Sequence, residues 1–160
     1  MFYQKLLPAL AEHPVRFPPV GGLAVNIHGI ARMTMDVDVI IALDPQNVDH
    51  FIAAAKELGL RPVLPVRLSE LADPAKRREW VEQRNRVALA PRAGEADVPT
   101  VDLMLGIELQ FESAYRRRAV RDLDGIAIDV ASIPDLIAIK DQSGRDQDRH
   151  DIEHLRKLER

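Results

Sequence analysis

Apolar residues recur along this chain with two different periods, which predict helices and strands. The clearest helical window spans residues 44–59, where Asp44 supplies an N-terminal cap, Pro45 stands in the first turn and Gly59 follows the last. The clearest strand is MDVDVIIAL, residues 35–43, which is rich in β-branched and apolar residues and contains neither Gly nor Pro. Both kinds of element are therefore expected early in the chain.

The rest of the pattern continues this alternation. Further helices are predicted at residues 2–13, 23–28, 73–85, 107–115 and 133–160, the last with a break near Ser143-Gly144. Extended segments are predicted at 15–22, at 86–106 on either side of a polar loop of residues 91–98, and at 118–132, where Asp124-Gly125 is a hairpin signal. Alternating helices and strands indicate a mixed β-sheet flanked by helices. We expect one α/β (α+β) domain over residues 1–160, with the C-terminal helices 133–158 packed on it.

Composition narrows the class of protein. The chain has 160 residues, of which 46% are hydrophobic, which is enough for one domain with a real core. Its net charge of −3 is not that of a general nucleic-acid binder, so an RNA partner would need a local basic patch. The absence of cysteine excludes disulfides and thiolate metal sites. We find no signal peptide and no apolar run of about 18 residues that would span a membrane, and we expect a cytoplasmic protein.

Two carboxylates interrupt the strand at residues 35–43. Asp36 and Asp38 are two positions apart, so their side chains share one face of the strand and repel each other. A third acid, Asp102, stands between Val101 and Leu103 in a later strand. Carboxylates among apolar residues must be paired, solvated or bound to metal. Three of them on neighbouring strands would make an oxygen-ligand site suited to Mg²⁺ or Mn²⁺.

A possible phosphate site precedes these carboxylates. Gly21 and Gly22 open a short predicted helix, where free N–H groups and the helix dipole favour an anion. A phosphate site beside a divalent-cation site has the parts needed for phosphoryl or nucleotidyl transfer. In that interpretation Asp36 and Asp38 hold the metal, and Asp102 is the third ligand and a possible base.

These motifs resemble a known signature. Two small residues at a helix start (Gly21-Gly22), a D-x-D strand (Asp36, Asp38) and a later acid (Asp102) are similar to the nucleotidyltransferase superfamily related to DNA polymerase β. The spacing of Arg32, Thr34, Asp36 and Asp38 looks most like the bacterial group that includes the AbiEii-type toxins. The C-terminal region is also similar, with a basic residue on a helix followed by Gly-Arg and an Asp-rich helix: Lys140, Gly144, Arg145, Asp148 and Asp151.

The resemblance implies an enzyme with a nucleotidyltransferase fold. It would use NTP and Mg²⁺ (or Mn²⁺) to move an NMP to an acceptor hydroxyl on RNA or tRNA, a small molecule or a protein. Nucleotide-binding residues carried over by the resemblance are Gly21, Gly22, Arg32, Thr34, Lys140 and Arg145. The polymerase-like members carry extra domains for the acceptor, so here the acceptor would use the same domain, a homo-oligomer interface or a protein partner, for example within a toxin–antitoxin system. The alternative is an inactive member of the same fold that acts as an antitoxin or partner-binding module.

Other features have simpler interpretations. His150 and His154 share one helix face, as zinc-binding pairs do, but no third ligand is evident, and a solvated helix face explains them as well. The basic triplets 76–78 and 116–118 are candidate RNA phosphate contacts or simply solvated surface. Arg32 and Thr34 could be loop residues, and Lys140 could extend along the edge of the core rather than reach a phosphate.

Overall fold

A computed structural model of the chain describes residues 3–84, 86–91, 99–105 and 111–160. The helices are α1 (Leu6–Glu12), α2 (Gly21–Ile27), α3 (Pro45–Glu57), the 3-10 helix η1 (Leu68–Ala72), α4 (Pro74–Arg84), α5 (Phe111–Arg117), α6 (Ile133–Ser143) and α7 (Asp146–Leu158). The strands are β1 (Asp36–Val39), β2 (Leu60–Pro62), β3 (Arg86–Pro91), β4 (Thr100–Met104), β5 (Ala119–Leu123) and β6 (Ile126–Val130).

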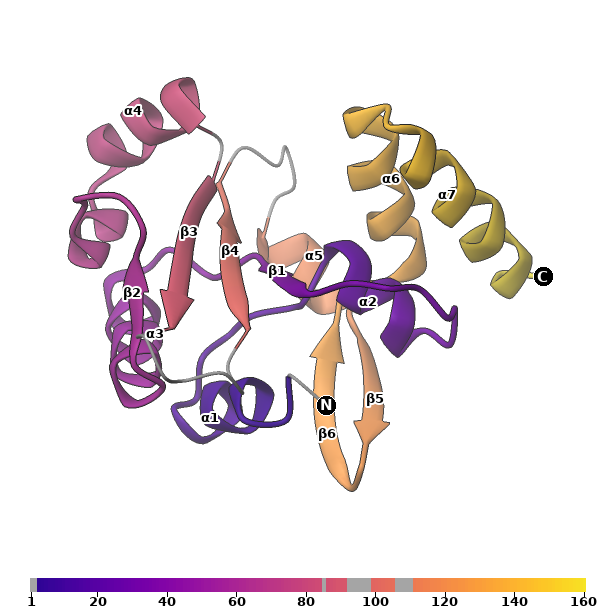
Figure 1. The fold of residues 1–160 in the computed structure, drawn as a ribbon, viewed down its shortest axis with the longest axis horizontal. Coiled ribbons are helices and arrows are strands. Elements are labelled where there is room, and N and C mark those ends of the chain that lie inside the picture. The colour runs from indigo at the N-terminus through magenta and orange to yellow at the C-terminus, as the bar shows by residue number, and fades with distance from the viewer. Residues whose placement is uncertain (1–2, 85, 92–98, 106–110) are drawn as a thin grey trace.

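The strands form one mixed sheet and one hairpin (Figure 1). The sheet has the order β1-β4-β3-β2, with β1 parallel to β4 and the other neighbours antiparallel. The separate hairpin β5–β6 turns at Asp124-Gly125, as predicted. The predicted mixed sheet flanked by helices is confirmed. Most predicted helices and strands are present, whereas the predicted polar loop 91–98 lies almost wholly outside the described residues.

The strand with the two acids is shorter than predicted. Regular strand β1 covers only Asp36–Val39, although the chain stays buried and hydrogen-bonded beyond it. The Ile40 N–H donates to the Pro18 carbonyl and the Ala42 N–H to the Arg16 carbonyl. The partner segment contains two prolines, which have no N–H to donate, so a regular two-sided ladder cannot form there. Residues 16–20 thus line the outer edge of β1 and lead directly into α2.

The helices pack around this sheet from several sides. In Figure 1, α2 lies beside β1, and the pair α6–α7 lies beyond α2, away from β2. Helix α3 contacts β2 and α1, and α1 also contacts β6. The core between them is apolar and includes the fully buried Leu23, Val37, Phe51, Leu103 and Leu136. Burial of apolar surface holds these elements together, and it contributes about 25 cal/mol of stabilisation per Å². No helix among the described residues is long and apolar enough to cross a membrane.

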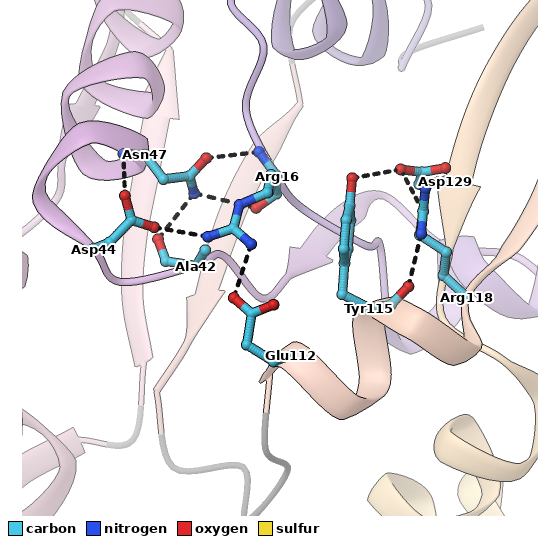
Figure 2. A network of polar contacts seen from close by, with 8 residues as sticks. All are labelled: Arg16, Ala42, Asp44, Asn47, Glu112, Tyr115, Arg118 and Asp129. Atoms are coloured by element: carbon cyan, nitrogen blue, oxygen red, sulfur yellow. Dashed lines mark hydrogen bonds and ion pairs between the residues drawn. The ribbon is translucent and has the colours of Figure 1, made fainter.

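A polar network fixes the segment that leads into α2 (Figure 2). The buried Asn47 of α3 accepts from the Arg16 N–H at 2.7 Å and donates to the carbonyls of Arg16 and Ala42. The guanidinium of Arg16 pairs with Asp44, the N-cap of α3, and with Glu112 of α5. Because buried amides are costly to leave unpaired, these bonds fix the path of the chain into α2.

Candidate active site

The pairing of β1 with β4 determines the geometry of the candidate site. In their parallel register Asp38 stands opposite Asp102, and Asp36 stands opposite Thr100. Asp36 is exposed at the start of β1, Asp38 is half-buried, and Asp102 is only 4% exposed. Strand periodicity and this register together bring the three predicted acids to neighbouring positions.

The three carboxylates influence one another's ionisation. Burial raises the pKa of Asp38, and the nearby carboxylates of Asp102 and Asp36 raise it further. Burial also raises the pKa of Asp102, and Asp36 adds to this, although the guanidinium of Arg86 opposes both effects. The repulsion anticipated from the D-x-D motif is therefore present in the folded chain.

Gly21 brings the start of α2 against Asp38. Its φ is +61°, a left-handed conformation that favours glycine, and a Cβ there would lie 1.9 Å from Asp38 Oδ2 and 2.9 Å from Asp38 Cβ. At Gly22 a Cβ would lie 2.8 Å from Thr34 Oγ1 and 3.0 Å from the guanidinium carbon of Arg32. The two glycines thus allow the backbone to pack directly on the acidic strand and on the segment before it.

A cavity of about 420 Å³ opens beside Gly21 and Gly22. Five basic residues line it, against two carboxylates, so the cavity suits an anion with several charges. The basic residues are Arg32, Arg84, Arg86, Lys140 and Arg145, and the acids are Asp38 and Asp148. Two buried guanidinium nitrogens, Arg32 Nε and Arg84 Nη1, have no hydrogen-bond partner within the described part of the chain. Buried donors of this kind are expected to bind a ligand or water.

A buried cluster of ion pairs holds two of these basic side chains in place. Lys140, 4% exposed, donates to Asp148 and Asp151, each at 2.8 Å. Arg32 pairs with the same Asp151 at 2.5 Å. Burial opposes ionisation of Asp148, but hydrogen bonds from Lys140 and Ser143 outweigh it and lower the pKa of Asp148. Asp151 therefore links α7 to the residues before β1 and fixes the position of Lys140.

The predicted site residues fall into two groups. Gly21, Gly22, Arg32, Asp38, Lys140 and Arg145 all line the cavity. Thr34 lies against Gly22, Asp36 is at the exposed start of β1, and Asp102 reaches the cavity through its ion pair with Arg86. Sequence reasoning missed Arg84 and Arg86. For Arg86 the signal was the expected pairing of the strands in 86–106, because it stands opposite Met104, two positions from Asp102. Arg84 is the last residue of helix α4, and no sequence signal pointed to it.

Among the residues that the structure covers, no group of three or more His, Asp or Glu side chains is arranged to hold a metal ion. At Asp102 one carboxylate oxygen is already bonded within the protein, because Arg86 Nη1 donates to Asp102 Oδ2 at 2.7 Å. The histidines of α7 have no third ligand within the described segments, and His154 Nδ1 lies 2.9 Å from the His150 carbonyl oxygen.

Three of the six residues in the basic triplets form internal ion pairs in the structure. Arg117 pairs with Asp135, Arg118 with Asp129, and Lys76 with Glu79. Figure 2 shows Arg118 and Tyr115 both bonded to Asp129. These carboxylates lower the net positive charge of the surface around the triplets, and binding to a nucleic-acid backbone depends on that charge.

No family model and no curated protein matches this chain. Among solved structures, it is similar to the lincosamide antibiotic adenylyltransferase LnuA bound to lincomycin, with 15% identity and a TM-score of 0.63 over 98% of this chain and 96% of that one. It is also similar to the antibiotic-resistance factor ANT(2'')-Ia, with 15% identity and a TM-score of 0.57 over 98% of this chain and 80% of that one. At these identities the similarity shows a shared fold, which is the predicted nucleotidyltransferase fold. The closer resemblance to AbiEii-type proteins stays a prediction.

The contact between Gly21 and Asp38 can be tested with a matched pair of variants. Gly144 also has a left-handed φ, +65°, but a Cβ there would meet nothing within 4 Å. We expect Gly144→Ala to cost about 1 kcal/mol of unfolding free energy from backbone strain alone. Gly21→Ala should cost about 1–3 kcal/mol more, because Asp38 or the backbone must move. Urea denaturation of both variants measures the difference, and equal losses would contradict the contact.

Because the pKa of Asp38 is raised, replacing this carboxylate by a neutral side chain is expected to stabilise the protein in a pH-dependent way. Because that pKa is higher in the folded than in the unfolded chain, ionisation above about pH 4 destabilises the folded state as pH rises through the folded pKa. We expect Asp38→Asn to raise the melting temperature at pH 7 in the presence of a chelator, and to have little effect at pH 3. Asp49→Asn, at an exposed position of α3, is the control. A gain of the same size at both pH values would refute this account of Asp38.

Proposed function

We propose that this protein is a divalent-cation-dependent nucleotidyltransferase that moves an NMP from an NTP to a hydroxyl group of an acceptor. One observation carries the proposal: three mutually repelling carboxylates on adjacent parallel strands lie beside a cavity with five basic side chains. Carboxylates and basic side chains so close together are expected where a metal and a polyphosphate bind side by side. The shared fold with solved adenylyltransferases agrees with this.

The cavity supplies the triphosphate site. Lys140 and Arg32 are fixed by Asp151, so they present their charge at little further entropic cost. Arg145 is exposed at the cavity and can adapt to the ligand. The unpaired Arg32 Nε and Arg84 Nη1 are donors that a phosphate oxygen would satisfy. These contacts favour a ligand with several negative charges over a single phosphate.

The acidic strand supplies the cation site. Asp36 and Asp38 offer carboxylate oxygens on one face of β1, and Gly21 leaves the room beside Asp38 that a side chain would fill. This donor set suits Mg²⁺ or Mn²⁺, and Asp102, whose Oδ2 accepts from Arg86 in the present structure, would be the third ligand. When bound, the cation neutralises charge on the phosphates during transfer.

The reaction is an in-line displacement at the α-phosphorus. The acceptor oxygen forms a bond to that phosphorus, the bond to the β-phosphate oxygen breaks, and pyrophosphate leaves with its electron pair. Asp102 is the group proposed to accept the hydroxyl proton, and burial raises its pKa in the direction that a base requires. The cations Lys140, Arg32 and Arg145 stabilise charge on the departing pyrophosphate.

A small molecule is the acceptor that we favour. The LnuA structure is described as lincomycin-bound, and this chain covers 96% of it. An RNA acceptor would require a basic surface, whereas the chain has a net charge of −3 and its basic triplets are partly neutralised by internal pairs. An RNA or protein acceptor, a toxin–antitoxin partner, a homo-oligomer and a cytoplasmic location stay predictions.

One observation favours the alternative of an inactive, partner-binding member of the fold. Asp102 is paired with Arg86, and no three-ligand group is preassembled within the described chain. Such a protein would bind no NTP in the presence of Mg²⁺. Direct binding of nucleotide therefore separates the two candidates.

Activity is tested with ATP labelled at the α-phosphate, Mg²⁺ and a panel of lincosamide, aminoglycoside and tRNA acceptors, with the product identified by mass spectrometry. We expect one acceptor to gain one nucleotidyl group and label transfer to stop with EDTA. Asp38→Asn should lower the rate on the order of 100- to 1,000-fold. Glu153→Gln, at an exposed position of α7, should not change it. An Asp38→Asn variant as active as the wild type would exclude this mechanism.

A further inference from the structure

Arg86 forms an ion pair with one carboxylate of the candidate cation site. It is the first residue of β3, and its Nη1 donates to Asp102 Oδ2 at 2.7 Å. The two side chains differ in environment: that of Asp102 is 6% exposed, and that of Arg86 is 58% exposed. Arg86 also lines the basic cavity beside Asp38, Lys140 and Arg145.

We propose that Arg86 is an exchangeable counter-ion that couples cation binding to nucleotide binding. In the ligand-free protein it neutralises Asp102. When the nucleotide enters the cavity, Arg86 moves to a phosphate oxygen, and the released Asp102 oxygen becomes available to the cation. This inference rests on the proposed function and assigns Arg86 a positioning role within it.

Asp102 needs a counter-ion because it is buried next to other acids. A buried carboxylate without a partner is strongly destabilising, and Asp36 lies near enough to raise the pKa of Asp102. The more buried basic side chains of the cavity pair with other carboxylates: Lys140 binds Asp148 and Asp151, and Arg32 binds Asp151. Among the residues described by the structure, Arg86 alone forms an ion pair with Asp102.

The same pair is well suited to exchange. More than half of the Arg86 side chain is exposed, so its charge is solvated once it leaves Asp102. The cost of moving Arg86 therefore lies in the uncompensated charge on the buried Asp102, and an incoming divalent cation would remove that cost. A guanidinium and a divalent cation repel each other at one carboxylate oxygen. We therefore do not expect the two to bind Asp102 Oδ2 at the same time with full affinity.

The coupling follows from two competitions, one for Arg86 and one for Asp102. A nucleotide phosphate competes with Asp102 for Arg86, while the cation competes with Arg86 for Asp102. Each ligand therefore removes an obstacle to the other, and by linkage the two effects must be equal in size. The direct contact between cation and phosphate adds to this coupling but does not depend on Arg86.

Calorimetric titration with Mn²⁺, with and without a non-hydrolysable ATP analogue, tests the proposal. The variants are Arg86→Gln and, as the charge-matched control, Arg145→Gln. Arg145 lines the same cavity, and none of its contacts described by the structure is an ion pair with Asp36, Asp38 or Asp102. Circular dichroism confirms folding of each variant. Arg86→Lys, which keeps the charge but forms a weaker pair, replaces Arg86→Gln should that variant not fold.

We expect the analogue to raise the Mn²⁺ affinity of the wild type on the order of tenfold or more. Arg86→Gln should bind Mn²⁺ alone several-fold more tightly than the wild type, and the gain on adding the analogue should shrink by a similar factor. Arg86→Lys should change both quantities in the same direction but less. Arg145→Gln should weaken analogue binding and leave Mn²⁺ binding without nucleotide unchanged.

Two results would overturn the role of Arg86 while leaving the proposed function intact. One is a Mn²⁺ affinity of Arg86→Gln equal to that of the wild type. The other is an equal increase in Arg86→Gln and Arg145→Gln, which would indicate a general charge effect. A wild type that binds neither Mn²⁺ nor the analogue would instead overturn the proposed function and this inference together.

Discussion

Repulsion between carboxylates on adjacent strands is the constraint on which the rest of this structure depends. The parallel pairing of β1 and β4 brings Asp38 opposite Asp102, with Asp36 nearby. Burial makes that arrangement unfavourable without positive charge close to it. Arg86 supplies part of that charge in the ligand-free protein, and in the proposed function a divalent cation supplies the rest. The acids are therefore best explained by function, because packing alone gives no reason to place them together.

The surrounding elements hold this unfavourable arrangement in place. Asn47 and Arg16 fix the segment that lines β1 and enters α2 (Figure 2). Gly21 then lets the start of α2 pack directly against Asp38. Asp151 of α7 pairs with both Arg32 and Lys140, which lie far apart in the sequence. A site built on rigid elements holds its groups more precisely than one built on loops.

Sequence predicted the parts of this site that follow from local rules. Strand periodicity placed Asp36 and Asp38 on one face, and the D-x-D motif with Gly21-Gly22 indicated the fold that the solved neighbours share. It could not predict which cation pairs with Asp102, because that depends on the antiparallel register of β3 and β4. It likewise gave Lys140 a phosphate role without revealing its pairs with Asp148 and Asp151, which depend on how α6 and α7 pack. Whether residues 1–160 form one folding unit stays a prediction.

A crystal structure with Mn²⁺ and a non-hydrolysable ATP analogue would show whether metal and nucleotide bind side by side here, because anomalous scattering locates the metal without ambiguity. We expect a Mn²⁺ peak between the carboxylates of Asp36 and Asp38, with the phosphates in the cavity lined by Arg32, Lys140 and Arg145. We also expect Arg86 to have moved from Asp102 to the ligand. Nucleotide bound elsewhere on the surface, with no metal at the acidic strand, would contradict the proposed site.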